Sequence, residues 1–114
     1  MINLQVDEGY AFDYLSILEV KNSHINNQQT KKNLEDCSNL LKVQLGDIFF
    51  KIIESEEYKN LIRANNNSFL IIDRVRDGEK VSAKEVDALN TQRFTHKKNL
   101  QRLFFNNDVQ ECKN

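Results

Sequence analysis

The 114-residue sequence contains no proline, no tryptophan, only three glycines and only two cysteines. Because proline breaks helices and glycine weakens them, their scarcity is typical of a chain that is helical along most of its length. Two cysteines cannot form a disulfide framework, which excludes the stapled folds of small secreted domains. The three glycines, Gly9, Gly46 and Gly78, stand alone and cannot build the glycine-rich loops that hold nucleotide phosphates.

Long apolar runs and an excess of one charge are also missing. The longest apolar stretches, residues 45–53 and 69–72, are broken far short of the ~20 residues that cross a membrane. The N-terminus has neither the basic nor the apolar segment of a secretory signal. We therefore expect a cytoplasmic protein of a bacterial or phage-infected cell, with no membrane partner. The formal net charge of -1 argues against a general nucleic-acid binder, although residues 88–107 contain no acidic side chain and form a basic helix that can contact phosphates.

Apolar residues recur three and four positions apart over most of the chain, which predicts an all-α fold. We expect an antiparallel bundle of three or four long helices in a single domain over residues 1–105, with a disordered tail over 106–114. The expected helices begin at Asp7, Thr30, Ser55 and Ser82 and end before residues 22, 54, 78 and 106. The sequence Ser82-Ala83-Lys84-Glu85 is a capping box. Alternating apolar residues over 1–6 predict a short extended N-terminal arm.

The expected helix over 30–53 has the most regular apolar seam and carries Gly46 in its middle. Glycine costs ~1 kcal/mol in helix propensity relative to alanine, and a close helix crossing at this point would offset that cost. The helix over 30–53 and the next one could also form one bent rod. Apolar residues cover more of its circumference than one intramolecular seam needs, which predicts a homo-oligomer.

Polar residues interrupt the apolar stripes of the last two helices. Arg93 and His96 lie in the middle of the last stripe, Asn65 interrupts the preceding one, and Asn90, Arg93 and Lys97 share a helix face. Buried cations need partners. The carboxylates available on other helical positions are Asp13, Glu19 and Asp73. Three interpretations stay open: an internal network that fixes helix register, a pocket for an anionic or sugar-like ligand, and a solvated face.

Three segments carry a longer pattern. Residues 6–21 read Val-x-x-Gly-x-x-x-Asp-x-x-Ser-Ile-Leu-Glu-x-Lys, residues 65–76 contain Asn65, Phe69, Asp73 and Arg76, and residues 90–97 read Asn-x-x-Arg-x-x-x-Lys. In this order the chain resembles a family of small, uncharacterised helical proteins of bacteria and phages. It departs from that family at Tyr10, Tyr14, Phe69 and Ile72. The resemblance implies a shared set of polar positions and implies no activity.

Signatures of catalysis and metal binding are absent from the sequence. The spacing of His24, His96, Cys37 and Cys112 fits no metal site, so we expect neither a metal nor a cofactor. Glu54 and Glu57 form an E-x-x-E motif that resembles half of the metal site of helical pyrophosphohydrolases, but the matching downstream E-x-x-D is missing. We interpret these acids as the start of a helix, where the dipole favours negative charge.

The sequence thus favours a non-catalytic interaction or accessory protein that presents helix faces to a protein partner or to copies of itself. A phage origin fits this interpretation. The alternative is a helical bundle, with or without enzymatic activity, that binds a small anionic or sugar-like ligand in a polar pocket between helices. In that alternative two cations clamp the anion, two asparagines orient it and a carboxylate acts as base. The candidate residues are Asp13, Glu19, Asn65, Asp73, Arg76, Asn90, Arg93 and Lys97.

Overall fold

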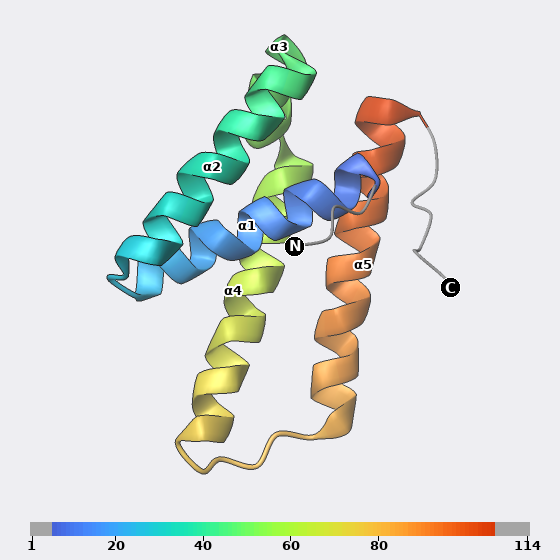
Figure 1. Ribbon diagram of the computed structural model, residues 1–114. Coiled ribbons are helices and arrows are strands. Elements are labelled where there is room, and N and C mark those ends of the chain that lie inside the picture. Colours follow the sequence, from blue (N-terminus) through green and yellow to red (C-terminus); the bar gives the residue numbers. More distant parts are fainter. Residues whose placement is uncertain (1–5, 107–114) are drawn as a thin grey trace.

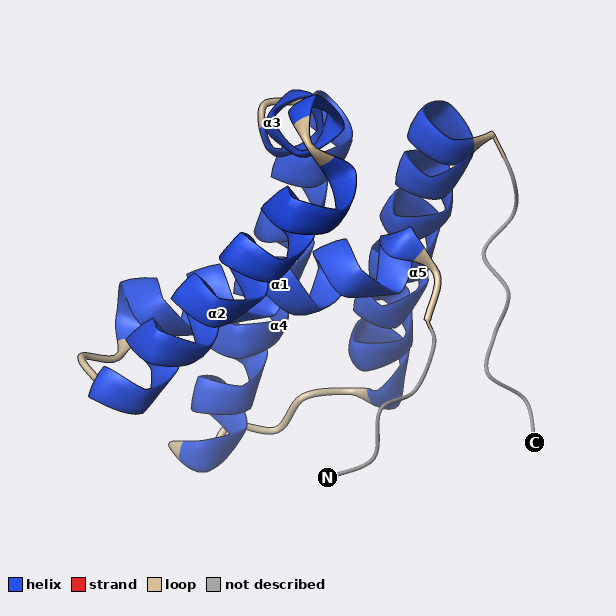
Figure 2. Cartoon of the chain, turned by 45° about the horizontal axis from the view of Figure 1, so that its top comes forward, coloured by secondary structure: helices blue, strands red, loops and turns tan. Residues whose placement is uncertain are grey.

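The computed structural model describes residues 6–106, which form five helices and, within that range, no strand (Figures 1 and 2). The helices are α1 (Glu8–His24), α2 (Gln28–Leu45), α3 (Asp47–Ile53), α4 (Glu56–Arg76) and α5 (Ala83–Phe105). The all-α prediction is confirmed, with five helices in place of the expected three or four. The expected extended arm lies outside the described residues except for Val6, and the expected tail lies outside them except for Asn106.

Side-chain caps define three helix starts. Asn27 accepts hydrogen bonds from the backbone N–H groups of Gln29 and Thr30, Ser55 accepts one from Tyr58, and Ser82 accepts one from Glu85. These bonds satisfy donors that have no partner inside the first turn of a helix. The predicted caps at Ser55 and Ser82 are therefore confirmed. At the start of α1, Asp7 occupies the N-cap position, but its side chain accepts no capping hydrogen bond.

The expected continuous helix over 30–53 is wrong, because the chain breaks at Gly46. This residue has φ 60° and ψ −132°, ends α2 and precedes α3. A Cβ atom at Gly46 would meet nothing within 4 Å, so no helix crosses closely there. The positive φ angle at this position requires glycine, because other residues rarely adopt a left-handed backbone conformation.

Close helix packing occurs instead at Gly9, in the first turn of α1. A Cβ atom on Gly9 would lie 3.0 Å from the backbone oxygen of Lys97 in α5. The missing side chain therefore lets the N-terminal end of α1 lie directly on α5.

Helix α1 lies across the centre of the fold and packs against α2, α4 and α5 (Figure 1). It forms a hairpin with α2, while α4 and α5 run side by side in opposite directions. The buried apolar cluster lies where these helices and α3 meet and consists of Phe12, Leu15, Leu41, Phe49, Ile52, Tyr58, Leu61 and Leu100. Within it the ring of Phe12 stacks on Phe49 and meets Tyr58 edge-on. None of the helices described over residues 6–106 has the length and apolar character needed to span a bilayer.

The rest of α4 and α5 extends beyond this core as a helical hairpin (Figure 1). We call residues 66–96 the α4–α5 arm. The buried residues of α4 all lie at or before Asn65, and those of α5 all lie at or after Lys97, so none of the arm's residues is buried. Arg74 ties its tip together, with ion pairs to Glu79 at 2.7 Å and to Glu85 at 3.0 Å.

Candidate functional site

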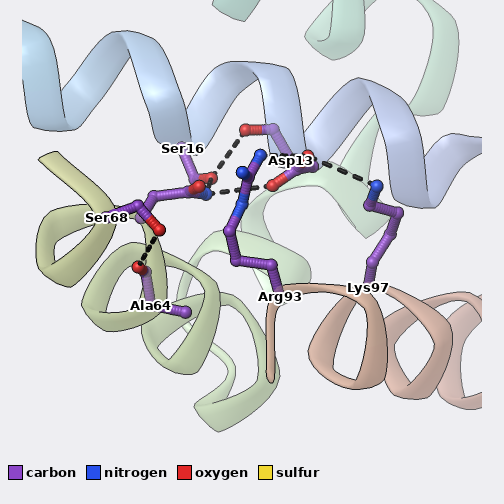
Figure 3. Close-up of polar contacts among 7 residues, drawn as sticks. Asp13, Ser16, Ala64, Ser68, Arg93 and Lys97 are labelled. Atoms are coloured by element: carbon purple, nitrogen blue, oxygen red, sulfur yellow. Dashed lines mark hydrogen bonds and ion pairs between the residues drawn. The ribbon is translucent and has the colours of Figure 1, made fainter. Parts of the chain in front are cut away.

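Polar side chains from three helices meet around Asp13, at the boundary between the core and the α4–α5 arm (Figure 3). Asn65 Nδ2 donates to Asp13 Oδ1 at 2.9 Å and to Ser16 Oγ at 2.6 Å. Arg93 Nη2 and Lys97 Nζ each lie 3.4 Å from Asp13 Oδ2. We call these five residues the Asp13 cluster.

Helical spacing explains why these groups converge. Asp13 and Ser16 are three residues apart on α1, and Arg93 and Lys97 are four residues apart on α5, so each pair lies on one helix face. Asn65 comes from the middle of α4, where the last buried residues of that helix occur. Because α1 crosses both α4 and α5, a carboxylate on its buried side can accept from both helices. The cluster therefore fixes the positions of α4 and α5 on α1.

The charges of the Asp13 cluster do not cancel. One carboxylate faces two cations, and the side chains of Asp13 and Lys97 are only 8% and 11% exposed. The ammonium group of Lys97 also lies 4.1 Å from the centre of the Tyr10 ring, a cation–π contact that stabilises its charge. Arg93 is the least satisfied member, because its Nε is buried and has no hydrogen-bond partner among the described residues.

A second buried polar group lies one helical turn beyond Lys97. Gln101 is fully buried, accepts a hydrogen bond from the backbone N–H of Gly9 at 2.6 Å, and donates to Glu8 at 2.8 Å. It thereby satisfies an N–H in the first turn of α1, which has no acceptor inside its own helix. Sequence reasoning missed Gln101, and it left Ser16 out of the candidate residues although Ser16 belongs to the pattern over residues 6–21. Gln101 lies four residues after Lys97 and Ser16 three after Asp13. This spacing places each of them on the same helix face as a candidate residue and could have identified them.

Four of the eight candidate residues, namely Asp13, Asn65, Arg93 and Lys97, come together in this cluster, and four do not. Asp73, one of the three available carboxylates, lies in the arm, where it forms an exposed ion pair with Arg76 at 3.8 Å and takes no part in the Asp13 cluster. Asn90 is exposed, beside Arg93, on the groove between α4 and α5.

Glu19 accepts a hydrogen bond from the Tyr58 hydroxyl at the other end of α1. Burial, and then the bond to Glu19, raise the pKa of the Tyr58 phenol far above its ordinary value. Tyr58 therefore stays a proton donor to Glu19 and does not act as a base. Tyr58 is part of the core, Glu19 is exposed at its edge, and the pair is separate from the Asp13 cluster.

Arg93 lies between two cavities. The first, which we call the root cavity, measures about 160 Å³ and has apolar walls from α1 and α4, with Lys21, Asn65, Ser68 and Arg93 as its polar groups. The second, the arm groove, measures about 290 Å³ and runs between α4 and α5, lined mainly by aliphatic side chains. Both cavities are open to solvent, and Ser68, Ile72 and Arg93 line both.

Over residues 6–106 the structure contains no group of three or more histidine, cysteine, aspartate or glutamate side chains that could hold a metal ion. The carboxylate oxygens of Asp13 already accept contacts from an amide and two cations, which leaves this carboxylate poorly placed to act as a general base. No protein-family model, no curated protein and no solved structure matches the chain. The site must therefore be interpreted from its own geometry.

Proposed function

We propose that this is a non-catalytic interaction protein that associates with a second copy of itself through the α4–α5 arm. The observation that carries the proposal is the absence of any buried residue over positions 66–96, although the arm is rich in large apolar side chains. Leu70, Ile72, Val75 and Val86 are 43%, 56%, 54% and 39% exposed. Exposed apolar surface is typical of an interaction site. Leu40, Val43 and Phe50 are also exposed, but the arm differs from α2 and α3 in having no buried residue.

The shape of the arm favours other helices as its partner. Two antiparallel helices bury only the seam between them, and a second helical hairpin laid against that seam gives a four-helix bundle. Each square ångström of apolar surface removed from water stabilises the assembly by roughly 25 cal/mol before the costs of association. The aliphatic walls of the arm groove, which include Ile71, Val75 and Leu89, are the surface that such packing would cover.

The charge of the arm favours a second copy over a strongly charged partner. Residues 66–96 contain five acidic and five basic side chains, so the arm as a whole is neutral. An interface with twofold symmetry places the same surface on both subunits and must be complementary to itself. A surface of one sign would repel its own copy, whereas a neutral surface with both signs can pair with it.

We further propose that this association is an accessory role in the cytoplasm of a bacterial or phage-infected cell. Support for this comes from the sequence, through the resemblance of residues 6–21 and 90–97 to the family of small helical proteins of bacteria and phages. Fractionation of the native host cell tests the location, since recovery in the membrane or secreted fraction would contradict it.

Light scattering over a series of protein concentrations tests the association, with one variant in the arm and one matched variant outside it. Val75→Asp places a charge on the arm groove and should leave the protein monomeric at concentrations where the wild type is a dimer. Val43→Asp makes the same change on α2, where Val43 is 84% exposed, and should associate like the wild type. A wild type that stays monomeric at every concentration would defeat the proposal, and so would dissociation by Val43→Asp alone.

A further inference from the structure

The root cavity combines an apolar interior with a cation at one side. Its apolar walls are Ile17 and Val20 of α1 and Phe69 and Ile72 of α4, and Arg93 reaches it from α5. The volume of about 160 Å³ is close to the ~150 Å³ of an engineered apolar cavity that binds benzene. The cavity therefore has room for a molecule the size of one small ring.

The charges around this cavity favour an anionic ligand. In the Asp13 cluster two cations share one carboxylate, and Lys21 adds a further positive charge to the cavity lining. Among the residues that the structure describes, no acidic side chain lines the root cavity. A charge that is partly removed from water is stabilised by an opposite charge more strongly than one in bulk solvent, because the local dielectric constant is lower.

Arg93 has donor capacity that Asp13 does not use. A guanidinium group carries five N–H donors, and its strongest contacts with carboxylates are paired bonds of about 2.7–2.9 Å. In this structure the Arg93 Nη2 to Asp13 Oδ2 distance is 3.4 Å, Nε has no acceptor among the described residues, and the side chain is 27% exposed. An incoming carboxylate would give the guanidinium a second acceptor while Lys97 continues to pair with Asp13.

We propose that the root cavity binds a small organic monocarboxylate, with its carboxylate on Arg93 and its apolar part between α1 and α4. This inference does not rest on self-association, because the residues that line the root cavity all belong to one copy of the chain. The apolar walls favour such a ligand over inorganic anions, and the cations favour it over neutral ring compounds.

Benzoate is the probe that tests the proposal, in an NMR titration of the full chain with isothermal calorimetry alongside. The wild type should bind benzoate saturably, with the largest shifts at the amides of Val20, Ser68 and Ile72. Arg93→Met should weaken binding by at least about tenfold, whereas Lys84→Met, which removes an exposed cation from the same helix, should leave it unchanged. The calorimetry is carried out at a protein concentration where the chain is monomeric, which separates this outcome from that of the self-association test.

Three further ligands define the outcomes. Benzyl alcohol has the ring without the charge, benzylamine has the opposite charge, and inorganic phosphate has the charge without the ring. Binding of benzyl alcohol or benzylamine as tight as that of benzoate would overturn the role of Arg93, and binding of phosphate with the same shifts would overturn the apolar part. Absence of saturable benzoate binding to the wild type would overturn the proposal outright. If Arg93→Met does not fold, the Lys21→Met variant and the positions of the shifted wild-type amides test the proposal instead. Lys21→Met is expected to bind benzoate more weakly than the wild type.

Discussion

At the scale of single residues, Asp13 is the acceptor on which the polar interior depends. Replacing it by alanine leaves Arg93, Lys97 and the amide of Asn65 without the carboxylate they share. Removing one partner of a buried ion pair leaves an uncompensated charge and typically costs about 3–5 kcal/mol. We therefore expect Asp13→Ala to lower the free energy of unfolding in urea by about 3–5 kcal/mol.

Asp73→Ala is the matched control for this change. Asp73 is also a helical aspartate in an ion pair, but its side chain is 45% exposed and the pair with Arg76 is 3.8 Å long. Exposed ion pairs contribute about 0–1 kcal/mol, so its unfolding free energy should change by no more than about 0.5 kcal/mol. Equal, small effects of the two substitutions would show that the Asp13 cluster does not hold the helices together.

Part of this cluster could be predicted because charged and amide side chains are conspicuous inside an apolar stripe. Asn65 and Arg93 interrupt such stripes, Lys97 shares a helix face with Arg93, and all three do meet Asp13. Ser16 and Gln101 could not be singled out in the same way, since serine and glutamine are ordinary on exposed helix faces. Their burial depends on how closely α1 approaches α4 and α5, which the spacing of residues in one helix does not reveal.

At the scale of helices, Gly46 decides that α2 and α3 are two elements. In the sequence the apolar spacing of Leu41, Leu45, Ile48 and Ile52 runs through the break, but in the structure Ile48 is exposed and Phe49 is buried in its place. A pattern of apolar residues that continues across a glycine predicts one helix. The positive φ angle that divides the helix cannot be inferred from the spacing of apolar residues. The caps at Ser55 and Ser82 could be predicted because a local side-chain hydrogen bond produces them.

The substitution Gly46→Ala separates these two descriptions by the sign of its effect. In a continuous helix, alanine would stabilise the protein by up to ~1 kcal/mol relative to glycine. At the observed φ of 60° and ψ of −132° alanine is strained, and we expect a loss of about 1–3 kcal/mol in the unfolding free energy. Thermal or urea unfolding measures it, and an increase in stability would mean that α2 and α3 form one helix in solution.

At the scale of the whole molecule, stability is unevenly distributed. Burial is concentrated where α1 contacts α2, α4 and α5, while the α4–α5 arm contains no buried residue and is tied at its tip by exposed ion pairs of Arg74. Helices without buried faces are marginal in water, because most helical stability in proteins comes from tertiary packing. The arm is therefore expected to open locally without unfolding of the core.

Hydrogen exchange at two protein concentrations tests this division together with self-association. At a concentration where the protein is monomeric, amides of residues 66–96 should exchange at least about tenfold faster than those of α1, a factor that corresponds to ~1.4 kcal/mol. At a concentration where it is dimeric, the arm should become protected while α1 changes little, because binding to the folded arm suppresses its opening. Exchange in the Val75→Asp variant should not depend on concentration. Uniform protection of α1 and the arm in the monomer would show that the arm is stable without a partner, and would remove the energetic reason for its association.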